Sequence, residues 1–316
     1  MTSLQQAISL INAGRSDEGV QALRQIASSG DPQALLLLAD MTWSGNLVPQ
    51  DPARGRLLFE YAAALGHGQA NIVATNLLAS GIAGKRDWRL ALQRLAEEGR
   101  EAPQRRVAAE LIAAMDLDPN GDPRTIPAPL TLADEPYARL FEGLFTADEC
   151  KHLIGVVQQL FEPSMVYRKG QQAVRDTIRT SDGAPLHWLL EDPAVTALNR
   201  RIAAATQTEY EYGEALQVLR YSPGQEYRPH FDFLEGVPNP RPWTALIYLN
   251  DDYEGGETEF VRTGLKVRGK PGDMLVFRNS TSGDVRDPLA EHAGLPVTSG
   301  IKYLATRWIR ARRWIP

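Results

Sequence analysis

The pattern of apolar and polar residues divides this 316-residue chain into two parts. Up to about residue 115 the sequence is rich in alanine, leucine and glutamine and has almost no β-branched runs, which favours helices. From about residue 215, short strand-forming stretches alternate with glycine, proline, asparagine and aspartate. The expected strands cover residues 215–221, 227–233, 243–249, 258–261, 265–267, 274–277 and 301–310. The chain is therefore expected to be a multidomain α and β protein.

The helical part repeats itself every 36 residues. Equivalent positions hold matching small or capping residues, namely Gly30 and Gly66, Ala34 and Ala70, Gly45 and Gly81, and Asp51 and Asp87. A period of this length is typical of stacked helix pairs, in which glycines end helices and each pair covers the apolar face of its neighbour. We therefore expect an all-α helix-pair solenoid.

Three motifs give this segment a family resemblance. Residues 43–45 (Trp-Ser-Gly), 51–55 (Asp-Pro-Ala-Arg-Gly) and 61–66 (Tyr-Ala-Ala-Ala-Leu-Gly) resemble the SEL-one-like branch of the tetratricopeptide superfamily. The resemblance implies that the solenoid binds peptides or proteins on its concave side. An equally plausible alternative is that it only supports the second domain or forms a dimer interface.

A proline-rich segment separates the two parts. Residues 116–136 contain five prolines, which restrict φ and remove backbone donors, so this segment is expected to be an extended linker. The expected domains are residues 1–115, the linker 116–136 and residues 137–316. In the second domain, the Thr146 to Glu149 capping box begins a helix, and a second helix begins at Asp192. Residues 163–185 are polar, and 168–172 are expected to be mobile.

The end of the chain is expected to form a β-sandwich or jelly roll. Many short strands without intervening helices indicate this class of fold, and a jelly roll can hold a metal at its mouth.

Composition narrows the function. The formal net charge of -5 argues against a general nucleic-acid or anionic-membrane binder, and no segment approaches a membrane-spanning length of apolar residues. The amino terminus has no signal-peptide pattern, so a cytoplasmic protein is expected. Cys150 is the single cysteine, which excludes an intrachain disulfide, and it is expected to be buried on the apolar face of a helix.

Two histidines and one aspartate are candidate metal ligands. In an extended strand His230 and Asp232 point the same way, and His292 could supply a third ligand. Two imidazoles and one carboxylate form the set that holds non-haem Fe(II) on one face and leaves other positions open. The alternative is an ordinary His-x-Asp on a strand surface. The other histidines are not expected to be ligands: His67 lies at a repeat turn, His152 on an exposed helix face and His187 near the mobile segment.

Lys302 is the next candidate, on the last expected strand. It shares one face with Leu304, Thr306 and Trp308, and if that face lines the barrel its ammonium is buried and needs an anion. Fe(II), Asp232 and a dianionic 2-oxo acid together leave one negative charge, which a single lysine neutralises. A solvated lysine on an edge strand is the alternative.

The second domain resembles a known enzyme family. Residues 136–312 resemble the catalytic domain of the prolyl 4-hydroxylases, which are Fe(II)- and 2-oxoglutarate-dependent dioxygenases with a double-stranded β-helix (jelly-roll) fold and flanking helices. The motifs that carry the resemblance are residues 216–221, 224–227, 229–232, 244–249, 255–258, 271–273, 292–297 and 300–303.

The resemblance implies a role for each matching residue. His230, Asp232 and His292 would bind iron, and Lys302 would bind the distal carboxylate of 2-oxoglutarate. Tyr221 and Thr244 would be hydroxyl donors near this cosubstrate, and Trp308 would pack beside it. The implied cofactors are Fe(II), 2-oxoglutarate and O2, with ascorbate as a further one.

The resemblance also suggests residues that contact substrate. Arg241 matches a family arginine that contacts the peptide, and Arg179 lies in a further matching segment. Arg310 stands where the prolyl 4-hydroxylases tend to have histidine, and Tyr303 where they favour tryptophan, which weakens the assignment of proline as the substrate.

The expected function is hydroxylation of an unactivated C–H bond in a peptide or protein, with proline as the first candidate and with release of succinate and CO2. One alternative keeps this chemistry but acts on a free amino acid or small metabolite. The other is a partner-binding module without catalysis.

Overall fold

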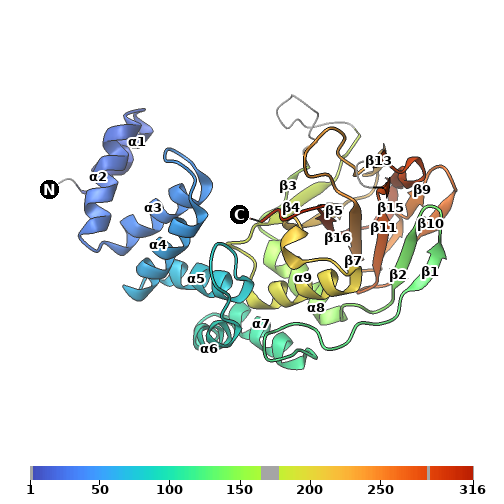
Figure 1. The fold of residues 1–316 in the computed structure, drawn as a ribbon, viewed down its shortest axis with the longest axis horizontal. Coiled ribbons are helices and arrows are strands. Elements are labelled where there is room, and N and C mark those ends of the chain that lie inside the picture. The colour runs from blue at the N-terminus through green and yellow to red at the C-terminus, as the bar shows by residue number, and fades with distance from the viewer. Residues whose placement is uncertain (1–2, 165–177, 283–284, 316) are drawn as a thin grey trace. The chain divides into compact units, whose positions relative to one another are not determined.

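The computed structural model describes residues 3–164, 178–282 and 285–315 (Figure 1). The chain divides into two compact units, one comprising Met1–Ala109 with Trp188–Thr196 and the other Glu110–His187 with Ala197–Ile315. The domain boundaries expected at residues 115 and 136 stay predictions. Within the described residues, no helix has the length and apolar character needed to cross a membrane.

Within the described residues, seven helices precede the first strand. They are α1 (Leu4–Asn12), α2 (Ser16–Ser28), α3 (Pro32–Ser44), α4 (Pro52–Ala64), α5 (Gly68–Ser80), α6 (Trp88–Glu98) and α7 (Pro103–Ala114) (Figure 1). The starts of α2, α4 and α6 are spaced by 36 residues, as are those of α3 and α5. The 36-residue period of helix pairs is therefore confirmed.

The repeated residues explain where these helices begin and end. Asp51 and Asp87 cap α4 and α6, each accepting a hydrogen bond from a backbone N–H three residues on. Gly45 and Gly81 end α3 and α5 at φ values of 76° and 77°, in the left-handed region that favours glycine. The peptide-binding role of this solenoid stays a prediction.

Two antiparallel sheets dominate the second unit. The larger has the order β1-β2-β11-β7-β16-β5-β4-β3, and the smaller has the order β10-β9-β14-β6. The larger sheet contains β1 (Leu130–Ala133), β2 (Ala138–Phe141), β3 (Glu162–Pro163), β4 (Asp182–Leu186), β5 (Leu216–Tyr221), β7 (Trp243–Tyr248), β11 (Met274–Arg278) and β16 (Lys302–Ile309). The smaller contains β6 (Tyr227–His230), β9 (Thr258–Phe260), β10 (Leu265–Val267) and β14 (His292–Gly294). Two short ladders pair β12 (Ser280–Ser282) with β13 (Val285–Arg286) and β15 (Val297–Gly300) with β8 (Tyr253–Gly255).

The hydrophobic core lies between the two sheets. Tyr248 and Phe277 of the larger sheet and Phe260 of the smaller are fully buried in one cluster, and the Phe260 and Phe277 rings meet edge to face. Side chains from both inner faces thus form one core, which is the packing of a β-sandwich. The expected fold class, a helix-pair solenoid followed by a jelly roll, is confirmed.

Helices α8 (Ala147–Val157) and α9 (Pro193–Thr206) flank the strands. Thr146 and Glu149 form the expected capping box at the start of α8, and Glu149 also accepts two hydrogen bonds from Arg201 at 2.8 and 3.0 Å. Cys150 is fully buried, and burial raises the pKa of its thiol to about 12, so its packing role is confirmed. His152 was expected on an exposed face, but it is buried because α8 packs that face inward.

The seven expected strands are all present, but one of them ends earlier than expected and a further strand forms before them. The strand expected over 227–233 ends at His230, because its ladder with β14 ends there, so Asp232 lies in the following loop. Residues 182–186, for which no strand was expected, form β4, because pairing with β5 outweighs a sequence poor in strand formers. The segment 168–172, expected to be mobile, lies outside the described residues.

Candidate metal centre and adjoining pocket

Strand pairing brings two distant histidines together. His230 is the last residue of β6 and His292 is the first residue of β14, and the antiparallel register places them directly opposite each other. Their ring centroids are 4.2 Å apart. The ring of Tyr227 stacks on His230 with a centroid distance of 3.4 Å, and Phe277 meets His292 edge to face at 4.7 Å. The two imidazoles are therefore held in place from both sides.

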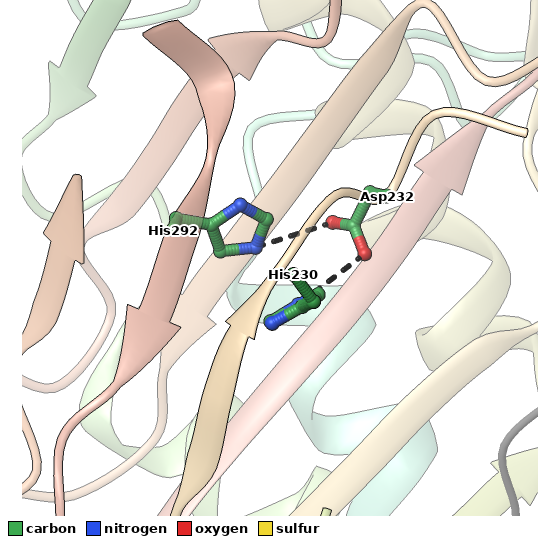
Figure 2. Close-up of side chains that lie close together, drawn as sticks. All are labelled: His230, Asp232 and His292. Carbon is green, nitrogen blue, oxygen red and sulfur yellow. Dashed lines mark ion pairs between the residues drawn. The ribbon is translucent and has the colours of Figure 1, made fainter. Parts of the chain in front are cut away.

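Asp232 completes the cluster. Its carboxylate faces both rings, and dashed lines join it to each of them (Figure 2). Oδ1 lies 3.7 Å from His230 Nε2, and Oδ2 lies 3.6 Å from His292 Nε2. One ligand atom from each of the three residues lies within 4.8 Å of the others. Asp232 is 5% exposed, so the carboxylate is almost completely removed from water.

Backbone contacts fix the protonation of the imidazoles. His230 Nδ1 lies 2.8 Å from the Arg228 carbonyl oxygen, and His292 Nδ1 lies 3.0 Å from the Ala290 carbonyl oxygen. A carbonyl oxygen only accepts hydrogen bonds, so each Nδ1 carries the proton and each Nε2 keeps a free lone pair. Burial, reinforced by the neighbouring His292, lowers the pKa of His230 to about 3. His230 is thus neutral at physiological pH.

Asp232 is ionised. Burial by itself would raise its pKa, but the two imidazoles to the extent that they are protonated, the charge of Arg241 and a hydrogen bond from Thr244 lower the pKa below its usual value. The cluster therefore presents two nitrogen lone pairs and one carboxylate to a common point. This donor set fits a divalent non-haem iron held on one face.

A pocket open to solvent adjoins the cluster. It lies between the sheets and receives side chains from both. Its lining residues are Arg179, Leu219, Tyr221, Tyr227, His230, Asp232, Leu246, Thr258, His292, Gly294, Lys302, Leu304, Thr306 and Trp308. The shared inner face expected for Lys302, Leu304, Thr306 and Trp308 is confirmed, because all four line this pocket.

Lys302 is a buried cation in the pocket wall. Lys302 is 2% exposed, and its Nζ donates a hydrogen bond to the Gly256 carbonyl oxygen at 2.6 Å. A Cβ at Gly256 would lie 3.2 Å from Lys302 Cδ, so glycine leaves the lysine its space. Burial lowers the pKa of Lys302 to about 8. Within the described part of the chain no carboxylate forms an ion pair with it, which leaves the ammonium suited to an anion in the pocket.

The structure separates the three residues expected beside the cosubstrate. Tyr221 and Trp308 line the pocket, and the Tyr221 ring lies 5.4 Å from Lys302 Nζ. Thr244 does not contribute to the described lining, because its hydroxyl donates to Asp232 Oδ2 at 2.8 Å. Its expected role as a hydroxyl donor near the cosubstrate stays a prediction.

The three candidate substrate arginines also differ. Arg179 is 5% exposed and lines the pocket, with its guanidinium over the Tyr227 ring. Arg241 and Arg310 lie outside the described lining, and both pair with the carboxylate of Glu214, their Nε atoms 2.5 Å from Oε1. The Arg241 guanidinium lies 4.1 Å from the ring centroid of Trp308, so this pair supports the pocket wall from behind.

Sequence reasoning missed three polar residues of the lining. Tyr227 and Thr258 belong to motifs quoted above but had no assigned role, and Thr306 was used only to define a strand face. The alternation of β16 contained the signal for Thr306, since it lies between Lys302 and Trp308 on the same face. No comparable pattern points to Asn279, whose side chain donates to Thr244.

Comparison with known proteins places the chain in a family. The 2OG-Fe(II) oxygenase superfamily matches residues 216–310, which include all three cluster residues and Lys302. Prolyl 4-hydroxylase 2 of Arabidopsis thaliana is 33% identical over 206 residues, covering 56% of this chain and 68% of that protein. The chain belongs to the prolyl 4-hydroxylase-like 2OG-Fe(II) oxygenases.

Other relatives extend the comparison for this 2OG-Fe(II) oxygenase. Prolyl 4-hydroxylase 1 of Arabidopsis thaliana is 32% identical over 204 residues, covering 58% of this chain and 72% of that protein. Among solved structures, the viral collagen prolyl hydroxylase of Paramecium Bursaria Chlorella virus-1 is 26% identical, with a TM-score of 0.44, covering 57% of this chain and 99% of the viral chain. As a member of the family the protein is an oxidoreductase that uses Fe(II), 2-oxoglutarate and O2.

Proposed function

We propose that this oxygenase hydroxylates an unactivated C–H bond in a peptide or protein, with a prolyl residue as the first candidate. The reaction consumes O2 and 2-oxoglutarate and releases succinate and CO2, so one oxygen atom enters the product and the other enters succinate. The observation that carries the proposal is the convergence of two imidazoles and one carboxylate on the wall of a pocket that also contains a buried ammonium group.

His230, Asp232 and His292 would hold Fe(II). Their Nδ1 hydrogen bonds keep both Nε2 lone pairs available, and the single carboxylate leaves the pocket side of the site open to further ligands. Bound iron would supply the activation of O2 and the oxidation of the C–H bond. The contribution of the protein is to orient the three donors and to exclude water from a carboxylate that is 5% exposed.

Lys302 would bind the distal carboxylate of 2-oxoglutarate. Its ammonium is desolvated and held at one position by the Gly256 carbonyl, so it gains a charge-assisted hydrogen bond without further ordering. Thr258 and Thr306 of the same lining offer further hydroxyls, and the rings of Tyr221 and Trp308 form apolar walls for the carbon chain.

The peptide would approach where Arg179 lines the pocket. The chain places this nearly buried guanidinium on the ring of Tyr227, which in turn stacks on His230. Arg241 and Arg310 would act on the substrate indirectly, since their charges are shared with Glu214 and Arg241 packs against Trp308. A peptide or protein substrate is supported by the names of the relatives, which are prolyl 4-hydroxylases.

The proposal is tested by incubating the protein and Fe(II) with proline-containing host peptides, with and without 2-oxoglutarate. We expect mass spectrometry to find peptides that gain one oxygen atom only when 2-oxoglutarate is present, with fragment ions locating the oxygen on a prolyl residue. An oxygen located on another residue would support the hydroxylation reaction but show that proline is not the residue that is hydroxylated. Succinate formation that is stimulated only by free amino acids would show that the substrate is not a peptide.

A further inference from the structure

Two buried side chains are linked to Asp232 by hydrogen bonds. Thr244, near the start of β7, and Asn279, between β11 and β12, are 0% and 1% exposed. Asn279 Nδ2 donates to Thr244 Oγ1 at 2.8 Å, and Thr244 Oγ1 donates to Asp232 Oδ2 at 2.8 Å. The three polar groups form a chain that ends on the carboxylate of the metal cluster.

The direction of this hydrogen-bond chain follows from the chemistry of its members. A threonine hydroxyl has one proton, and the ionised carboxylate of Asp232 only accepts, so the hydroxyl proton points to Oδ2. The other partner of Thr244 Oγ1 must then be a donor. The NH2 group of Asn279 therefore faces Oγ1, and its amide oxygen points away from it. Each group therefore has one orientation.

The backbone holds Asn279 firmly. Its N–H donates to the Pro242 carbonyl oxygen at 2.8 Å, and its carbonyl oxygen accepts from the Asp287 N–H at 2.9 Å. Thr244 belongs to a strand paired on both sides, with Phe277 of β11 and Trp308 of β16 as its partners in register. The donor that meets Asp232 is thus fixed by the larger sheet, although Asp232 itself lies in a loop.

We propose that Thr244, oriented by Asn279, is a positioning residue that occupies Oδ2 of Asp232 and presents Oδ1 to the metal. The inference rests on the proposed metal-binding function of the cluster. Oδ1 lies 3.7 Å from His230 Nε2, whereas Oδ2 lies 3.6 Å from His292 Nε2 and also accepts the Thr244 proton, so Oδ1 keeps more of its lone-pair capacity for the metal. A carboxylate outside regular secondary structure would otherwise rotate, and a second-sphere hydrogen bond prevents this rotation. The role differs from the cosubstrate contact that the sequence suggested for Thr244.

The test measures Co(II) binding to the full-length, metal-free protein by titration and by the visible absorption of the bound Co(II). Thr244→Val removes the hydroxyl at nearly constant volume and suits a strand, and we expect Co(II) affinity to fall about 10- to 100-fold with a changed Co(II) spectrum. Thr244→Ser keeps the donor and should restore both. Asn279→Ala should weaken binding less, because the Thr244 hydroxyl stays but loses its orientation.

A matched control separates positioning from general destabilisation. Thr42, in the helical unit, is also buried and hydrogen-bonded, through its hydroxyl to the Leu38 carbonyl oxygen, and Thr42→Val should leave Co(II) affinity and spectrum unchanged. One outcome would contradict the positioning role but support the metal site. In it, the wild type binds Co(II), His292→Ala does not, and Thr244→Val binds with the affinity and spectrum of the wild type. If the wild type binds no Co(II), the proposed function itself fails.

Discussion

Replacing Asp232 with alanine is expected to abolish Fe(II)-dependent conversion of 2-oxoglutarate to succinate while the protein stays folded. Asp232 is the single anionic group of the cluster, and without it only two imidazoles remain to face a divalent cation. The fold should survive, because the described core between the sheets is formed by other, apolar residues. The measurement is succinate formation at saturating Fe(II), with circular dichroism as the test of folding.

Asp40→Ala provides the control for this substitution. Asp40 is an exposed aspartate of α3, in the helical unit, and its loss should leave succinate formation unchanged. Wild-type turnover in folded Asp232→Ala protein would contradict the ligand set. His230→Ala and His292→Ala are expected to behave like Asp232→Ala, since each removes one of three ligands.

The second large effect is expected from Lys302→Met, which removes the ammonium group but keeps the length of the side chain. A charge-assisted hydrogen bond contributes about 1.5–3 kcal/mol, so 2-oxoglutarate affinity should fall roughly 10- to 150-fold. Co(II) affinity in the absence of 2-oxoglutarate should change little, because Lys302 is not part of the metal cluster. The control is Lys266→Met, an exposed lysine of β10. Unchanged 2-oxoglutarate affinity in Lys302→Met would show that another group binds the distal carboxylate.

The same lysine predicts how 2-oxoglutarate affinity depends on pH. Burial lowers the pKa of Lys302 to about 8, so the ammonium is charged below that pH and increasingly neutral above it. His230, with a pKa of about 3, stays neutral throughout this range. We therefore expect affinity to be constant just below pH 8 and to fall by about tenfold for each pH unit above it, until the loss equals that of Lys302→Met. Lys302→Met should lack this decline, and equal slopes in both proteins would assign the titration to another group.

The sequence predicted the parts of the fold and site that depend on local periodicity. The 36-residue spacing of glycines and aspartates set the helix boundaries, because these residues cap helices through contacts three or four positions away. Alternation along the last strand placed Lys302 and Trp308 on one inner face. Both results follow from geometry that repeats within a single element.

The parts that were missed depend on pairing between distant segments. Strand β4 contains glycine and proline and exists because β5 pairs with it. Asp232 reaches the cluster from a loop, where strand alternation no longer applies, and a hydroxyl from the larger sheet meets its carboxylate. The link from Asn279 through Thr244 joins residues that share no spacing, so no pattern in the sequence could reveal it.

In the proposed site, His230, Asp232 and His292 hold Fe(II), and 2-oxoglutarate binds to this iron next to Lys302. The most direct measurement is an anaerobic titration of the metal-free protein with Fe(II) and then 2-oxoglutarate, followed by visible absorption. We predict a weak charge-transfer band that appears only with both additions, is absent in Asp232→Ala, and needs a higher 2-oxoglutarate concentration in Lys302→Met. A folded, Fe(II)-loaded wild-type protein that shows no such band at saturating 2-oxoglutarate would contradict this account.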